Sequence, residues 1–238
     1  MSELKKKNIA IIMTFVLVLI ATFACVGALG SKNTNRLDVN KITIVLDAGH
    51  GGVDAGVNGV VTGVKESELN LKVVKKLQSY FISAGMNVVL TRNSDAGLYG
   101  VATKNLKKKD MQKRKEIIEN ADPTVVISVH MNKYSLQSRR GAQVFYKSKD
   151  NISKILANEI QKSLNEMDGA VRSCDALTGD YYILNCTSYP SVICECGFLS
   201  NPDDEALLIT DEYQDKIAYT IFKGVISYLA EASFKFCD

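Results

Sequence analysis

The chain has 238 residues, enough for one medium-sized domain with appendages, and its apolar fraction of 46% is ordinary for a packed core. Its formal net charge of +3 at pH 7 is too small for the dense basic stripe of a nucleic-acid-binding protein, so no nucleic-acid partner is expected. The sequence holds only two histidines, His50 and His130, and both follow apolar runs.

The N-terminus reads as a targeting segment. Three lysines at positions 5–7 precede an uncharged apolar run over 9–29, just long enough to span a bilayer, which takes about 20 residues. This order predicts a cytoplasmic N-terminus and an exported body. Residues 1–30 are therefore expected to be either a membrane anchor or a signal peptide cleaved near residues 28–30. The polar residues 31–41 are expected to form a linker.

The first element of the exported part is a buried strand over residues 42–48. It ends in Gly49-His50-Gly51-Gly52, where the glycines let the backbone leave the strand tightly. A loop over 51–65 follows, and from residue 67 apolar positions recur at helical spacing until Gly85. His50 is thus predicted to lie at the carboxyl edge of a sheet, where open α/β folds bind their ligands.

Strands and helices alternate along the rest of the chain. Apolar runs predict strands over 86–90, 124–129, 141–146, 181–184 and 191–196. Helices are expected over about 111–120, 151–167 and 212–229, with another start near 200–205, and residues 97–110 are expected to be a loop that carries a lysine cluster. The alternation predicts a single α/β domain, with a mostly parallel twisted central sheet and helices on both faces. This domain is expected to span residues 42–232, with 233–238 as a C-terminal tail.

Candidate metal ligands stand at three of these element ends. His50 and His130 close two predicted strands, and Glu66 opens the first long helix. Two imidazoles and one carboxylate, with a position left for water, form a catalytic type of zinc site. Glu66 is favoured over Glu68 because it stands at the junction of loop and helix, whereas Glu68 is already on the helix surface. Ordinary hydrogen-bonded roles for both histidines are the alternative.

Other charged residues allow more than one interpretation. Asp47 is a possible fourth ligand, a possible partner that orients His50 through its second nitrogen, or a turn cap. Arg92 and Arg114 are expected to make structural ion pairs rather than to bind peptide carboxylates. The lysine cluster around Lys108 is expected to be solvated, with an anionic wall polymer as the alternative partner.

Glu195 stands inside the otherwise apolar strand 191–196. Alternate side chains of a strand point to opposite faces, so Cys194 and Cys196 share one face and Glu195 takes the other. Because an unpaired acid is costly to bury, Glu195 is expected to face a cleft. There it could serve as general base toward a metal-bound water and then as general acid toward a leaving amine. A neutral carboxyl or a salt-bridge partner is the alternative, and the two cysteines are not expected to bind zinc.

Four motifs occur in an order that matches a known family. They are Asp-Ala-Gly-His-Gly-Gly at 47–52, Gly-Val-Lys-Glu-Ser-Glu-Leu-Asn-Leu at 63–71, Ser-Val-His-Met-Asn at 128–132 and Glu-Cys-Gly-Phe-Leu-Ser-Asn-Pro at 195–202. Over about residues 42–229 the chain resembles the zinc-dependent N-acetylmuramoyl-L-alanine amidases of the type-3 class. The resemblance implies that His50, Glu66 and His130 hold one zinc ion and that Glu195 is the catalytic acid and base. The second motif departs from the usual Glu-Lys-Asp, because Ser67 and Glu68 follow the zinc carboxylate. We expect this departure to affect neighbouring or substrate contacts.

The short chain, with its hydrophobic N-terminal segment and without wall-binding repeats, is similar to the germination-specific members of this family, which act on spore cortex peptidoglycan. The resemblance implies hydrolysis of the amide between the lactyl group of N-acetylmuramic acid and L-alanine, outside the cytoplasm, in cortex maturation (muramic lactam formation) and germination. Peptidoglycan is then the substrate, and the N-terminal segment contacts the membrane. Because three protein ligands are the minimum for zinc, a partner protein that assists the site is a further expectation. A zinc peptidase of the stem peptide and a non-catalytic wall-binding protein are the alternatives.

Overall fold

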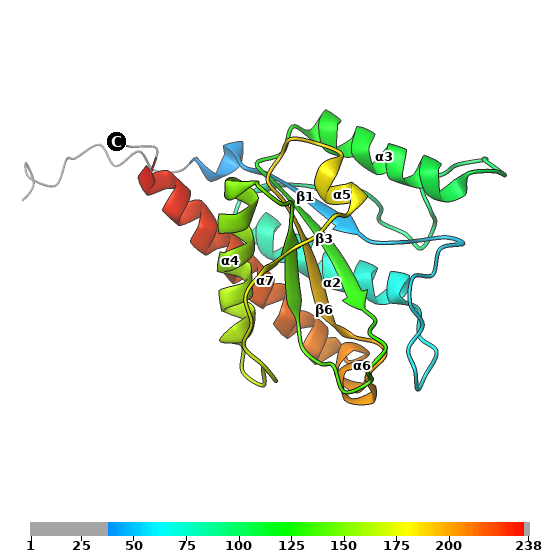
Figure 1. The fold of residues 1–238 in the computed structure, drawn as a ribbon. Coiled ribbons are helices and arrows are strands. Elements are labelled where there is room, and N and C mark those ends of the chain that lie inside the picture. The colour runs from blue at the N-terminus through cyan, green and yellow to red at the C-terminus, as the bar shows by residue number, and fades with distance from the viewer. Residues whose placement is uncertain (1–37, 236–238) are drawn as a thin grey trace, which may run out of the picture. The chain divides into compact units, whose positions relative to one another are not determined.

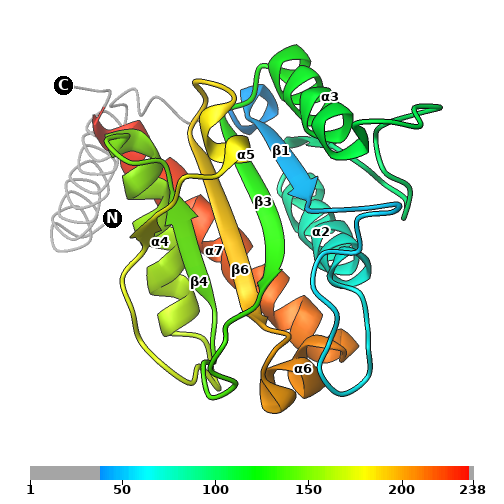
Figure 2. The same ribbon diagram turned by 45° about the vertical axis from the view of Figure 1, so that its right-hand side comes forward.

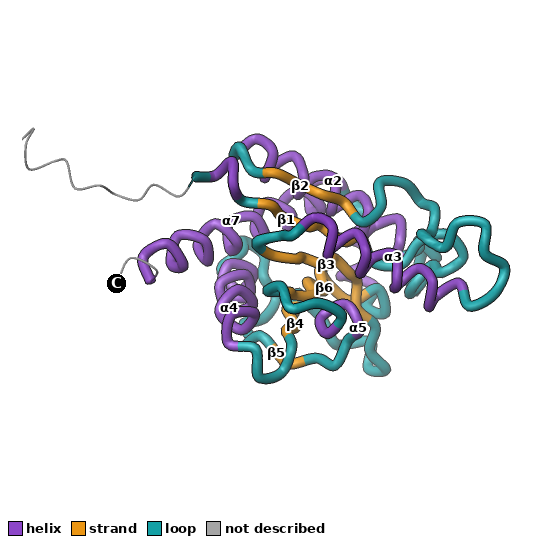
Figure 3. Tube along the Cα trace, turned by 90° about the horizontal axis from the view of Figure 1, so that it is seen from above, coloured by secondary structure: helices purple, strands orange, loops and turns teal. Residues whose placement is uncertain are grey.

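Three parallel strands buried on both faces lie inside the sheet, because their residues are mostly apolar. The computed structural model describes residues 38–235, and its strands lie in the order β2-β1-β3-β6-β4-β5 (Figure 3). They are β1 (Thr43–Ala48), β2 (Asn87–Leu90), β3 (Val125–Asn132), β4 (Gln143–Tyr146), β5 (Leu177–Thr178) and β6 (Ser191–Phe198). β2, β1, β3 and β6 are parallel, β4 is antiparallel to β6, and β5 is parallel to β4. The predicted mostly parallel sheet is confirmed.

Helices cover both faces of this sheet, as the alternation of elements predicts. One face packs against α2 (Glu66–Ser83), α4 (Asn151–Asn165) and α7 (Asp211–Lys235), which lie behind the strands in Figure 2. The other face is covered by α3 (Leu106–Ala121) and the short α5 (Tyr182–Asn185). Strand side chains alternate between these layers, so that Leu46 faces α2, α4 and α7 whereas its neighbour Val45 faces α3 and α5. The 3₁₀ turn η1 (Val39–Lys41) precedes β1, and α6 (Pro202–Leu208) follows β6 (Figure 1).

Local sequence explains where the helices begin and end. In α2 the apolar residues Leu69, Val73, Leu77 and Phe81 recur every four positions and are fully buried, and Gly85, with φ of 83°, follows the end of the helix. Helix α4 begins after an N-cap aspartate at position 150, whose carboxylate accepts main-chain hydrogen bonds from residues 152 and 153.

The predicted strand over 181–184 is wrong, because this segment forms the helix α5. Ile183 and Leu184 are both buried against the sheet face beneath α3. Two consecutive side chains pointing into the core do not fit a strand, whose side chains alternate, but they fit a helical turn. The edge strand beside β4 is instead β5, which lies a few residues earlier in the chain.

Several boundaries also differ from the expected ones. Helix α3 begins at Leu106, so the lysine cluster at 107–109 lies on its first turn and not in a loop. Strand β6 continues to Phe198, and α7 continues to Lys235, past the expected end of the domain at 232. The predicted hydrophobic segment over 9–29 and most of the predicted linker lie outside the described residues. Among residues 38–235, none of the helices has the length and apolar character needed to cross a membrane.

Candidate metal centre and catalytic site

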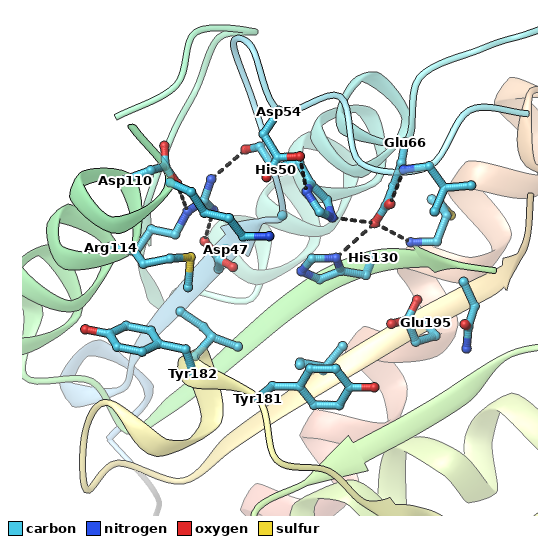
Figure 4. A pocket seen from close by; sticks show the side chains of 18 of the residues that line it. Asp47, His50, Asp54, Glu66, Asp110, Arg114, His130, Tyr181, Tyr182 and Glu195 are labelled. Carbon is cyan, nitrogen blue, oxygen red and sulfur yellow. Dashed lines mark hydrogen bonds and ion pairs between the residues drawn. The ribbon is translucent and has the colours of Figure 1, made fainter. Parts of the chain in front are cut away.

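Three strands and one helix bring the sequence-predicted site residues to one edge of the sheet (Figure 4). His50 follows the end of β1, His130 lies on β3, and Glu66 is the first residue of α2. One possible ligand atom from each of these three side chains lies within 4.8 Å of the others. Glu195 on β6 stands beside His130 in the register of the parallel pair β3 and β6. The structure therefore places all four residues around one cavity.

The carboxylate of Glu66 lies between the two imidazoles. Its Oε1 is 2.9 Å from Nδ1 of His130 and 3.3 Å from Nε2 of His50, and it also accepts a 3.1 Å hydrogen bond from the main-chain N–H of Met131. Its Oε2 accepts a 2.8 Å bond from the N–H of Val57. Burial opposes ionisation, but the bonds and charges of the two imidazoles lower the pKa of Glu66 well below its usual range. Glu66 is thus held as a carboxylate, the form that binds a metal.

Asp54 fixes the ring of His50 from the side away from Glu66. Its Oδ1 lies 3.0 Å from Nδ1 of the imidazole, while Nε2 faces the Glu66 carboxylate. Metal-binding histidines commonly direct their second nitrogen to a carboxylate in this manner. Asp54 was not among the residues predicted from the sequence to form the site. A signal was present, since an acid four residues after His50 lies within the same glycine-rich loop.

Asp47 pairs with a buried arginine and not with His50. It is buried on β1, pairs with the guanidinium of Arg114, and accepts hydrogen bonds from Thr91 Oγ1 at 2.6 Å and Ser128 Oγ at 2.5 Å. Burial opposes its ionisation, but Arg114 and the two hydroxyls lower the pKa of Asp47 to about 2. The interpretation of Asp47 as a partner that orients His50 is wrong, because that contact belongs to Asp54.

Two buried arginines hold the backbone where the chain leaves β1. Arg114 donates to the carbonyl of Ala48 at 2.8 Å and to that of His50 at 2.5 Å, and Arg92 donates to the carbonyls of Ala48 at 2.8 Å and Gly49 at 3.0 Å. These bonds stabilise a segment in which His50 has φ of 61°, an unfavourable value for a residue with a side chain. Arg114 also pairs with Asp110 at 2.6 Å, so its expected structural role is confirmed.

Two glycines leave the room that the site needs. A Cβ on Gly49 would lie 2.2 Å from Cε1 and Nε2 of His130, and a Cβ on Gly56 would lie 2.4 Å from Oε2 of Glu66. Both distances are far below van der Waals contact. Any larger residue at either position would displace one of the candidate ligands.

Glu195 faces the cavity with one unpaired oxygen. Its side chain is 9% exposed, and Oε2 has no hydrogen-bond partner among the described residues. Burial raises the pKa of Glu195 to about 7, partly offset by the imidazole of His130. Cys194 and Cys196 point to the opposite face and are buried in the core, as the alternation predicts. Buried carboxyls with raised pKa values are characteristic of general acids and bases.

The cavity has a volume of about 520 Å³ and a second wall that contains no candidate ligand. This wall includes Tyr181, which directly precedes α5, and Tyr182, the first residue of α5 (Figure 4). Met111 of α3 also lines the cavity. Lys107 and Lys133 also line the cavity. The two tyrosines were predicted as strand residues and not as part of the site, because the path of the chain before α5 is not apparent from the sequence.

The residues around this cavity fit zinc. Two imidazoles and a carboxylate are the ligands of many catalytic zinc sites, which keep a further position open. The orientation of His50 by Asp54 and the unpaired oxygen of Glu195 support the same assignment. An arrangement of this kind can bind and polarise a carbonyl group and can transfer a proton beside it.

Known proteins are similar to this chain in sequence and in fold. A family profile described as N-acetylmuramoyl-L-alanine amidase matches residues 44–227. The germination-specific N-acetylmuramoyl-L-alanine amidase of Bacillus subtilis is 34% identical over 195 residues, which cover 79% of this chain and 80% of that protein. The amidase LytC of the same bacterium is 30% identical over 205 residues, which cover 84% of this chain and 38% of LytC. Among solved structures, the CwlD amidase of Clostridioides difficile, in complex with the GerS lipoprotein, has a TM-score of 0.77 and 36% identity. That match covers 79% of this chain and 98% of the CwlD chain.

Proposed function

This chain belongs to the N-acetylmuramoyl-L-alanine amidase family, and we propose that it is a zinc-dependent member that acts on the peptidoglycan of the spore cortex. The main support for this proposal is that possible ligand atoms of His50, Glu66 and His130 lie close together, beside the unpaired carboxylate of Glu195. The bond to be cleaved is the amide between the lactyl group of N-acetylmuramic acid and L-alanine.

His50, Glu66 and His130 would hold the zinc ion. When bound, zinc would polarise the carbonyl of the lactyl amide and make a water molecule more acidic. Glu195 accepts a proton from this water as the water attacks the carbonyl carbon. It then donates the proton to the L-alanine nitrogen as the C–N bond breaks. Burial raises the pKa of Glu195 above its usual range, which suits a carboxyl group that first accepts a proton and then donates it.

We propose that the protein works outside the cytoplasm, on the cortex side of the forespore. The support is the name of the B. subtilis relative and the apolar run over 9–29, which follows three lysines. In the corresponding organisation, residues 1–30 are a signal peptide or anchor and 31–41 a linker. The catalytic domain begins at about residue 42 and includes the whole of α7, which ends at Lys235.

A partner protein is part of the same proposal. The related CwlD amidase was solved in complex with a lipoprotein. Three protein ligands are also the minimum for zinc, so a partner that secures the zinc site of this chain is chemically reasonable. Zinc content measured with and without the candidate partner tests this part directly.

Muropeptide analysis tests the activity. The full-length protein is incubated with isolated spore cortex, and the products are separated and identified by mass spectrometry. We expect intact stem peptides that begin with L-alanine, together with glycan that has lost them. Glu195→Gln should abolish this release. Shortened stems with intact lactyl amides would instead identify a zinc peptidase, and binding without release would identify a wall-binding protein.

A further inference from the structure

Tyr181 presents an aromatic face to the cavity. It is 41% exposed, and it lines the same cavity as His130 and Glu195 (Figure 4). Its exposed ring surface adds nothing to the core, and large exposed aromatic side chains beside a reactive centre commonly bind a ligand. Neither the zinc ligands nor the proton transfer by Glu195 requires this residue.

The ring of Tyr181 is fixed in place. It packs edge-on against Phe145 of β4, with ring centroids 5.6 Å apart and planes at 69°. On another side it approaches Gly179 so closely that a Cβ there would lie 2.4 Å from Cε2 of the tyrosine. A ring held between a strand and a glycine loses little conformational entropy when a ligand covers it, so the surface is preorganised for binding.

The charges on this wall decide which part of the substrate it suits. Asp180 directly precedes Tyr181 and lines the cavity with it, as does Glu195, whereas the lysines of the cavity lie on α3 (Lys107) and directly after β3 (Lys133). An anionic stem peptide is disfavoured beside the two acids. An amide-linked muramic acid residue has no charge, and one face of its pyranose ring carries C–H groups that pack on an aromatic ring.

We propose that Tyr181 is a specificity-determining residue that binds the sugar ring on the glycan side of the scissile amide. This inference rests on the proposed amidase function. It deepens that function by assigning the glycan to the wall formed by the segment before α5. The stem peptide then extends over the rest of the cavity.

Kinetics on two substrates test the inference. One substrate is a disaccharide-peptide muropeptide, and the other is the same stem peptide carrying an N-lactoyl group without sugar. For Tyr181→Ala we expect a roughly five- to tenfold rise in KM on the muropeptide, with little change in kcat. The KM for the lactoyl peptide should change less than about twofold, and Tyr181→Phe should behave as wild type. Tyr219→Ala is the matched control, because Tyr219 is 48% exposed and packs on Tyr80 and Phe222 of the opposite helical layer.

Binding of the free disaccharide separates this inference from the amidase assignment. Saturation-transfer NMR with full-length protein and peptide-free N-acetylglucosaminyl-N-acetylmuramic acid requires no hydrolysis. Wild type should saturate the sugar protons, and Tyr181→Ala should lose that signal. Equal losses on both kinetic substrates, unchanged kinetics, or sugar binding that is independent of Tyr181 would each overturn the inference. Absence of hydrolysis by wild type would overturn the amidase function alone.

Discussion

The carboxylate of Glu205 accepts a 2.6 Å hydrogen bond from the hydroxyl of Thr62, although the two residues are 143 positions apart in the chain. It also accepts bonds from the main-chain N–H groups of Val61 at 2.7 Å and Thr62 at 2.8 Å. The segment it holds is a hairpin-like turn whose base is closed by a 2.8 Å bond from Glu66 N to the carbonyl of Val57. Glu205, on α6, thereby fixes the tip of a turn whose base carries a candidate metal ligand.

Replacing Glu205 by alanine should loosen this turn. We expect the free energy of unfolding to fall by about 1–3 kcal/mol, since a charge-assisted acceptor for three donors is lost. The amides of Val61 and Thr62 should exchange hydrogen faster in mass-spectrometric measurements. Asp203→Ala is the control, because Asp203 is an acid on the same helix that pairs with Arg140 at the surface and should cost less than about 1 kcal/mol. Unchanged exchange at Val61 and Thr62 would show that Glu205 does not hold the turn.

The buried pair of Asp47 and Arg114 predicts a larger loss. Both side chains are 2% exposed, so Asp47→Asn leaves a buried guanidinium with Asp110 as its remaining acid and should cost about 2–4 kcal/mol in urea unfolding at pH 7. With a pKa lowered from 3.8 to about 2, Asp47 stabilises the fold above about pH 4, and this contribution is lost as the pH falls toward 2. The control Glu116→Gln breaks a half-exposed pair on α3 and should cost under about 1 kcal/mol. Equal stability of Asp47→Asn and wild type would refute the prediction.

The strand ends were the most predictable part of the site. His50 and His130 follow apolar runs, and a run buried on both faces must be a central strand whose end meets its neighbours at one edge. Glu195 was predictable because it is the one acid in the mostly apolar segment 191–196. Side chains of a strand alternate between its two faces, so Glu195 points away from the face that holds Cys194 and Cys196. For these residues, the local sequence pattern is sufficient to predict where the side chain lies in the fold.

The loops were not predictable from such patterns. Asp54 reaches His50 because three glycines around it, Gly51, Gly52 and Gly56, adopt positive φ values, and the sequence does not specify which turns they make. The segment 181–184 has the β-branched and aromatic composition of a strand, but burial of Ile183 and Leu184 beneath α3 makes it a helix. The tyrosine wall of the cavity therefore appeared only in the structure.

Glu195 should make the metal-free protein less stable at neutral pH than at acidic pH. Burial raises its pKa from 4.5 to about 7, so the folded state holds this proton more tightly than the unfolded chain does. The free energy of unfolding should therefore fall by roughly 2–4 kcal/mol between about pH 4.5 and pH 7, and it should stay lower above pH 7. In urea unfolding with a chelator, Glu195→Gln should remove this decline, whereas Glu68→Gln, a surface carboxylate paired with Lys65, should keep it. The same pH decline in Glu195→Gln would assign the titration to another group.

Asp54 should control zinc affinity without touching the ion. Its carboxylate lies 3.0 Å from Nδ1 of His50, and partners of this kind typically contribute 10- to 100-fold to metal affinity. We expect Asp54→Ala to weaken zinc binding by about that factor in competition with a chromophoric chelator at pH 7.5. Asp54→Asn, which keeps an oxygen acceptor for the imidazole N–H, should recover much of the affinity. Asp95→Ala is the control, since Asp95 stands in the neighbouring loop and its contact with this region, to Gly52, uses its main-chain carbonyl. If Asp54→Ala binds zinc as tightly as wild type, the ring of His50 is oriented by the backbone alone, through its φ of 61° and the bond from Arg114 to its carbonyl.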